Sequence, residues 1–169
     1  MTQPFAIGGN ILRVDLTRRA VTVEPTAPLN LRFPAGMGVN NWLLLNETPL
    51  GKAPLDPDNP LIFTAGSLVG TMAATACRMT ISCKNVLTGG FGAASAGGNF
   101  APELKYAGFD HIVVTGRAAQ PVYIDIDDGN VTICDADGLW GETTWETEKI
   151  LRARIDRPTL ELLSIGPAG

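Results

Sequence analysis

The sequence predicts an α+β fold in which two mixed or antiparallel β-sheets form a base that carries a few short helices. Short runs of alternating apolar and polar residues recur between turn residues, as is typical of paired strands. Only three segments have the length and periodicity of a helix, and all are short. The regular alternation of strand and long helix that marks a doubly wound dinucleotide fold is absent from the sequence.

The first half of the chain begins with a predicted hairpin, in which Thr17, Arg18 and Arg19 separate two alternating runs. The proline-containing stretch 25–34 should be extended. Residues 40–47 form a short predicted helix that ends before Pro49. The strands predicted in this half are NILRVDL (10–16), AVTVE (20–24), LIFTAG (61–66) and RMTISCKN (78–85).

The second half contains a glycine-rich segment, TGGFGAASAGGNF (88–100), in which five glycines occur close together. A helix is predicted at 102–108, since proline suits its first turn and Gly108 suits its end. Thr143 and Glu146 have the spacing of a capping box, which predicts the start of a helix at 143–155. The strands predicted here are DHIVVTG (110–116), PVYIDID (121–127), NVTICDA (130–136) and LELLSIG (160–166).

The length of 169 residues suits a single domain covering 1–169. Its last predicted strand runs directly into Gly-Pro-Ala-Gly, so we expect a domain that is truncated at its C-terminal end. Hydrophobic residues make up 45% of the chain, which is enough to build a core.

Charge and hydropathy favour a protein that binds neither nucleic acid nor membrane. The net charge is −4, and no apolar run approaches the roughly 20 residues that a membrane helix needs. The N-terminus lacks the pattern of a secretory signal, so we expect a cytoplasmic protein. The three cysteines are odd in number and have no CxxC spacing, which favours small buried side chains over disulfides or metal ligands.

Few residues offer nucleophilic or acid–base chemistry. His111 is the only histidine and precedes an apolar run, so we expect a structural role for it. No Ser-His-Asp set can be built without it. The acidic run at 125–128 resembles a calcium loop but lacks the distal glutamate, and a solvated hairpin tip explains it better.

The remaining candidate is glycine-rich backbone near a cation. Glycines allow a ligand to approach the backbone closely, and Arg78 could pair with a phosphate through two hydrogen bonds. The segment lacks the GKS/T of a P-loop and the acid of a dinucleotide fingerprint. Taken alone, it is explained equally well by tight turns in a domain rich in β-sheet.

Several motifs occur in an order that resembles the N-terminal domain of the tungsten-containing aldehyde:ferredoxin oxidoreductase family. The resemblance runs from about Gly9 to Gly169, and its most specific part is GGNFAPELKYAGFD (97–110). The other motifs are GNILRVDLT (9–17), LIFTAGSLVGTMAATACR (61–78), LWGETTWETEKIL (139–151) and SIGPAG (164–169). The chain also resembles the tungsten subunit of the benzoyl-CoA reductase that works without ATP.

The resemblance implies that the two-sheet base carries a tungsten (or molybdenum) bis-pyranopterin. Arg78 matches a family arginine that contacts the pterin. The pterin-contact loop is matched by Ala94, Ser95, Ala96 and Gly97. At the position of Ser95, well-known members have an asparagine whose backbone carbonyl helps to hold magnesium, and a backbone ligand tolerates a change of side chain.

The resemblance also assigns functions to regions outside this sequence. The cysteines that hold the iron–sulfur cluster lie in later domains, and neither Cys77, Cys83 nor Cys134 matches them. The parent enzyme would oxidise aldehydes to carboxylic acids with ferredoxin as electron acceptor, and the isolated chain would be inactive. A non-catalytic subunit that docks on a separate catalytic chain, and a relative that has lost the cofactor, remain as alternatives.

Overall fold

The computed structural model describes residues 9–30, 32–33, 36–157 and 159–167. It contains one six-stranded mixed sheet, one two-stranded antiparallel sheet and short helices, which confirms the α+β prediction. The strands are β1 (Asn10–Asp15), β2 (Ala20–Pro25), β3 (Leu61–Ala65), β4 (Met79–Lys84), β5 (Phe91–Ala96), β6 (Phe109–Thr115), β7 (Val122–Asp127) and β8 (Asn130–Asp135). The helices are α1 (Ala27–Asn30), α2 (Met37–Glu47), α3 (Phe100–Tyr106) and α4 (Thr144–Ile155).

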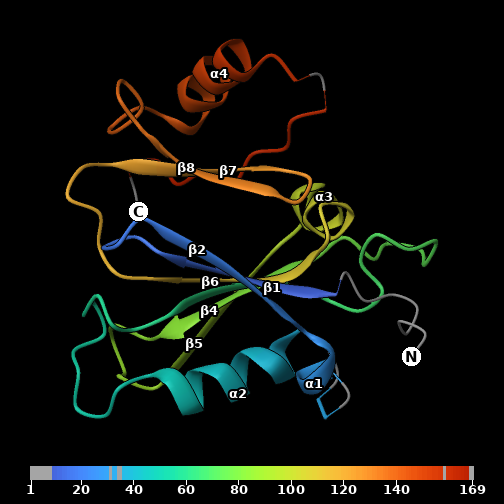
Figure 1. Ribbon diagram of the computed structural model, residues 1–169, viewed down its shortest axis with the longest axis vertical. Helices are drawn as coiled ribbons and strands as arrows, with labels where there is room; N and C mark the ends of the chain where they lie inside the picture. The colour runs from blue at the N-terminus through green and yellow to red at the C-terminus, as the bar shows by residue number, and fades with distance from the viewer. Residues whose placement is uncertain (1–8, 31, 34–35, 158, 168–169) are drawn as a thin grey trace.

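The large sheet forms the middle layer of the molecule, with strands in the order β2-β1-β6-β3-β4-β5. Figure 1 shows α2 below this sheet, and the β7–β8 hairpin with α4 above it. Only the β1–β6 pairing is parallel, and it joins segments about a hundred residues apart in the sequence. Because α3 leads directly into β6, the chain passes from the β5 edge back to the centre of the sheet through this one helix.

Both faces of the large sheet are covered, and β1 shows how. Ile11 packs with Val39 and Leu43 of α2 on one face. Leu12 and Val14 lie on the other face, in a cluster that includes α3 and apolar residues of the β7–β8 hairpin. The alternation in the sequence therefore separates two buried faces rather than a buried face from a solvated one.

The helix signals in the sequence are confirmed. Gly108 follows α3 with a φ of +94°, the left-handed conformation that suits a helix end. The Thr143 side chain accepts a hydrogen bond from the backbone N–H of Glu146, and the Glu146 carboxylate accepts one from the backbone N–H of Thr143, so the capping box is present at α4. Within the part of the chain that the structure describes, no helix has the length and apolar character needed to cross a membrane.

Three local predictions were wrong. Residues 160–166 form no strand, because no strand edge pairs with them among the described residues. The stretch 25–34 contains α1, since Pro28 is tolerated in a first helical turn; Pro34 lies outside the described residues. The helix predicted at 40–47 begins earlier, at Met37, directly after Gly36 with its φ of +88°.

Arg13 joins three elements through charged hydrogen bonds. Its Nη1 and Nη2 atoms donate to the two carboxylate oxygens of Glu47 in α2, each at 2.8 Å. Its Nε atom donates to Glu24 of β2, also at 2.8 Å. The hydrogen bonds to Glu47 raise the pKa of Arg13 above its ordinary value, so this cation remains charged at every accessible pH.

His111 is fully buried on the α2 side of the sheet. Its Nδ1 atom lies 2.6 Å from Thr64 Oγ1, while Nε2 has no hydrogen-bond partner among the described residues. Burial lowers the pKa of His111 to about 4, against an ordinary value of 6.5. The side chain is therefore a neutral component of the core at pH 7, in agreement with the structural role that the sequence suggested.

Replacing Arg13 with Met should reduce the free energy of unfolding by about 1–3 kcal/mol. Glu47 would lose both of its hydrogen bonds to the guanidinium, and Glu24 would lose its hydrogen bond to Nε. Urea denaturation monitored by circular dichroism would measure this. Replacing Arg18, whose side chain is 83% exposed, should change stability by less than about 0.5 kcal/mol. Equal effects of the two variants would contradict a stabilising role for the Arg13 network.

His111 should make stability depend on pH between about 6.5 and 4. The unfolded chain takes up a proton as the pH falls through 6.5, whereas the native side chain does so only near 4. The free energy of unfolding should therefore be unaffected by this residue above pH 6.5 and should decrease as the pH falls from 6.5 to 4, by about 3 kcal/mol in total. Urea denaturation at several pH values should show this dependence, and a His111→Gln variant should lack that component.

Candidate functional site

The candidate site lies at one edge of the large sheet, where β4 and β5 pair. The antiparallel register places Met79 opposite Ala96 and Thr80 opposite Ser95. Arg78 directly precedes Met79, and Gly97 directly follows Ala96. The structure therefore brings Arg78 and the predicted contact residues 94–97 to the same end of one strand pair.

This edge is open to solvent. Strand β5 is the last strand of the sheet, so one side of its backbone has no neighbouring strand among the described residues. Arg78, Ala94, Ser95 and Gly97 are exposed, and Ala96 is half-buried. Exposed backbone N–H groups beside a cation form a surface that suits an anionic ligand.

Gly97 and Gly98 leave the backbone of this surface uncovered by side chains. A Cβ atom built on either glycine meets no other atom within 4 Å, so the lack of a side chain is not required by packing inside the domain. Gly98 has a φ of +105°, which favours glycine on conformational grounds, whereas Gly97 is outside the left-handed region. The space above Gly97 is therefore available to a ligand.

None of the ion pairs formed among the described residues involves Arg78. The residue is exposed and directly precedes the strand that pairs with β5. A guanidinium in this situation can form bidentate hydrogen bonds to a phosphate without first breaking an internal ion pair.

Side chains of α3 hold the loop that carries Arg78, a feature that the sequence analysis missed. The loop comprises residues 66–78 between β3 and β4, and lies beside α3 in Figure 1. Lys105 Nζ donates to the carbonyl oxygens of Gly66 and Ser67, at 3.3 and 3.1 Å. Tyr106 donates its hydroxyl to the carbonyl of Gly70 at 3.2 Å. The only signal in the sequence was the motif at 97–110, which contains both side chains.

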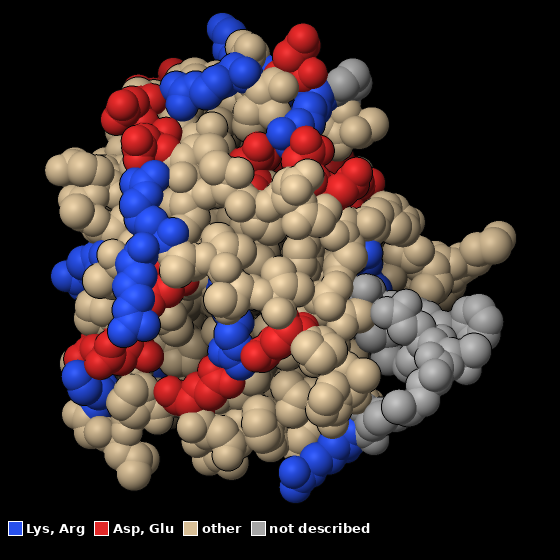
Figure 2. Space-filling view, viewed as in Figure 1, with Lys and Arg blue, Asp and Glu red and all other residues tan. Residues whose placement is uncertain are grey.

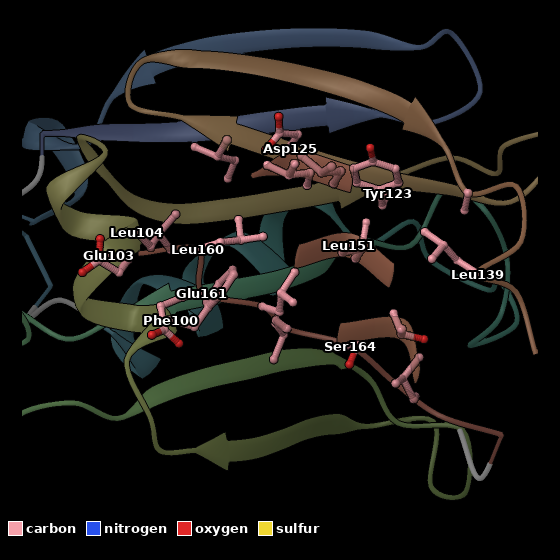
Figure 3. Close-up of a pocket in the computed structure, with 18 of the residues that line it drawn as sticks. Phe100, Glu103, Leu104, Tyr123, Asp125, Leu139, Leu151, Leu160, Glu161 and Ser164 are labelled. Carbon is pink, nitrogen blue, oxygen red and sulfur yellow. The ribbon is translucent and has the colours of Figure 1, made fainter. Parts of the chain in front are cut away.

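A separate cavity of about 650 Å³ lies between the two sheets. Figure 3 shows it surrounded by Phe100 and Leu104 of α3, Tyr123 of β7, Leu151 of α4 and Leu160 of the C-terminal segment. Its lining is largely apolar and includes neither Arg78 nor residues 94–97. The predicted cofactor residues therefore form an open surface outside this cavity.

The acidic side chains of the cavity do not form a metal centre. Asp125 accepts two hydrogen bonds of 3.0 Å from Arg157, and Asp127 lies 3.4 Å from the same guanidinium. In the described ranges, no three His, Cys, Asp or Glu side chains are grouped so that they could hold a metal ion. Any ion at Ser95 would depend on its backbone carbonyl.

The charges on the face drawn in Figure 2 are mixed. Lys and Arg side chains lie next to Asp and Glu side chains along one side of this face, and its middle is mostly uncharged. A continuous basic surface, which is typical of nucleic-acid binding, is not present on this face.

The three cysteines are partly buried and form no disulfide.

Comparison with known proteins extends these observations. Residues 11–169 match the model of the aldehyde ferredoxin oxidoreductase N-terminal domain. Over 162 residues, the chain is 41% identical to the tungsten-containing aldehyde ferredoxin oxidoreductase of Pyrococcus furiosus and 43% identical to that of Thermococcus kodakarensis. Each alignment covers 95% of this chain but 27% of the relative, so the chain spans about a quarter of the length of these relatives.

Two further relatives have different names. The WOR-like subunit of an aliphatic sulfonate oxidoreductase from Pyrococcus furiosus is 33% identical over 157 residues, which are 89% of this chain and 24% of that protein. In the solved active-site complex BamBC of benzoyl coenzyme A reductase with 1,5-dienoyl-CoA, one chain is similar with a TM-score of 0.93 and 34% identity. That match covers 97% of this chain and 25% of the other.

The family match covers nearly the whole chain, and relatives of 41–43% identity match 95% of it. On these grounds, the chain belongs to the aldehyde ferredoxin oxidoreductase N-terminal domain family.

Proposed function

We propose that this domain holds one side of a tungsten (or molybdenum) bis-pyranopterin in an enzyme that oxidises aldehydes to carboxylic acids. The observation that supports this most directly is the exposed Arg78 beside the open backbone of Gly97 at a free sheet edge. When bound, the cofactor would supply the two-electron redox chemistry. The domain itself would supply binding and orientation.

The residues present fit a phosphorylated pterin. Gly97 leaves room for a flat ligand to approach the backbone, and the unpaired side of β5 offers N–H and C=O groups to a heterocycle. Arg78 would pair with a phosphate or pterin oxygen. Ala94 and Ala96 have small side chains that would let the ligand lie close to the strand. Ser95 would contribute its backbone carbonyl to a magnesium ion between the pterin phosphates, independently of its side chain.

The remaining parts of the activity would come from other regions. We assign residues 1–169 to one cofactor-binding domain, with the iron–sulfur cluster held by further domains or a partner subunit and ferredoxin accepting the electrons. The whole assembly would work in the cytoplasm. The length of the relatives supports the presence of further domains, because the chain matches only 27% of each of them.

Aldehydes are the substrate class that we favour. The relatives named as aldehyde ferredoxin oxidoreductases are 41–43% identical to this chain, against 33–34% for the sulfonate and benzoyl-CoA relatives. A non-catalytic role as a docking module is the second candidate, and it is favoured by large exposed apolar side chains such as Trp140 and Trp145. Activity of the purified assembly with aldehydes, and its loss with the cofactor, would decide between the two roles.

Replacing Gly97 with Val should remove the cofactor without unfolding the domain. A Cβ atom at Gly97 meets no other atom within 4 Å, and the φ of Gly97 does not require glycine, so the domain has room for the side chain whereas a ligand lying on this backbone would clash with it. We expect tungsten and pterin contents of the intact enzyme, produced with tungstate, to fall about tenfold or more. A Gly129→Val variant, at another exposed glycine without close neighbours, is the matched control.

Replacing Arg78 with Ala should lower the same contents by about tenfold, since one charge-assisted pair is lost. An Arg18→Ala variant removes another exposed arginine, in the turn between β1 and β2 on the opposite side of the strand order, and should retain the cofactor. Metal analysis by mass spectrometry and fluorescence of the oxidised pterin would measure both. Normal tungsten and pterin in both the Gly97 and Arg78 variants would overturn the proposed function.

A further inference from the structure

The Lys105 side chain is charged although it is almost completely shielded from solvent. Its side chain is 6% exposed and its Nζ atom lies 3.6 Å from Asp110 Oδ1, whose own side chain is 1% exposed. Burial lowers the pKa of Lys105, while the carboxylate of Asp110 opposes this shift. Buried ion pairs often contribute little net stability, because the cost of removing both charges from water offsets their attraction.

The lysine also donates hydrogen bonds to one short stretch of backbone. Gly66 and Ser67, the first two residues after β3, each accept a hydrogen bond from Nζ through their carbonyl oxygens. Asp110 is held in turn, because its Oδ2 atom accepts a 2.9 Å hydrogen bond from the backbone of Gly9. The ammonium is therefore anchored on the sheet side and holds the loop on its other side.

Tyr106, the next residue of α3, holds the same loop further along. Its hydroxyl donates to the Gly70 carbonyl, and Gly70 has a φ of +73°. A Cβ atom on Gly70 would come within 3.2 Å of the Tyr106 ring, so the loop backbone lies close against this side chain. Two consecutive side chains of one helix thus contact three of the first five residues of the loop 66–78.

The same helix also follows the glycines of the candidate site. Gly97 is only three residues before Phe100, the first residue of α3. The held loop ends at Arg78, directly before the strand that pairs with residues 91–96. Helix α3 is joined covalently to the glycine half of the site, and through Lys105 and Tyr106 it holds the start of the loop that leads to Arg78.

We propose that Lys105 is a positioning residue for the cofactor. Its ammonium holds the 66–78 loop on α3, which aligns Arg78 with the glycine backbone before the cofactor arrives. This inference rests on the proposed function of the site. It assigns a task in cofactor retention to a side chain that touches no part of the candidate surface itself.

The test replaces Lys105 with Met in the intact enzyme and compares two readouts. In the apo form, made without tungstate, hydrogen exchange of the 66–78 amides should accelerate about tenfold, with little change in β1 and β6. In enzyme made with tungstate, tungsten and pterin contents should fall severalfold. Tyr106→Phe, which removes only a hydroxyl from an exposed side chain, should shift both readouts in the same direction by less and keeps the test valid if the Met variant fails to fold.

Arg13→Met is the matched control, because it breaks a charged network of the same sheet at a distance from the loop. It should leave exchange at 66–78 and cofactor content unchanged. Normal cofactor content in both α3 variants would overturn the inference, as would acceleration spread evenly over the whole domain. If the Gly97→Val and Arg78→Ala variants also retained the cofactor, the proposed function would fail. If only the α3 variants retained it, the function would stand and the role of Lys105 would be lost.

Discussion

The position of β6 at the centre of the large sheet is the constraint on which the rest of the structure depends. This strand pairs in parallel with β1 and antiparallel with β3, so it joins the two ends of the sheet. Phe109, Ile112 and Val113 are almost fully buried, and they supply apolar contacts to both faces. Because the β1–β6 contact closes a loop of about a hundred residues, it must be stabilised by this burial rather than by local preference.

From that centre, the order β6-β3-β4-β5 carries the chain to an open edge. The side chains of the strands near the centre are large and apolar, whereas β5 consists mainly of small residues and is exposed along most of its length. Small side chains make a poor core but leave the backbone accessible. The sheet therefore combines a rigid, buried support with an edge at which a large polar ligand can approach the main chain, as a preorganised binding site requires.

Helix α3 links these two parts of the fold. It leaves the glycine segment, crosses back to the centre and enters β6, and Lys105 and Tyr106 project from it onto the loop that ends at Arg78. Ala101 and Leu104 of the same helix are buried in two clusters of the core. One short helix thus couples the packing of the core to the geometry of the candidate site, which explains why a motif at 97–110 combines glycines, apolar residues and a buried ion pair.

The sequence by itself determined the local features: the hairpins, the glycine after α3, the capping box of α4 and the α+β class, whereas α3 begins at Phe100, two residues before the predicted start. Each depends on residues close together in the chain, where spacing and conformational preference are sufficient. Only the tertiary structure decided the parallel β1–β6 pairing, the contact of Lys105 with Gly66 and Ser67, and the cavity between the sheets. Residues 160–166 show the reason most clearly, because their apolar pattern suits a strand, yet a strand exists only where a neighbouring edge supplies its hydrogen bonds.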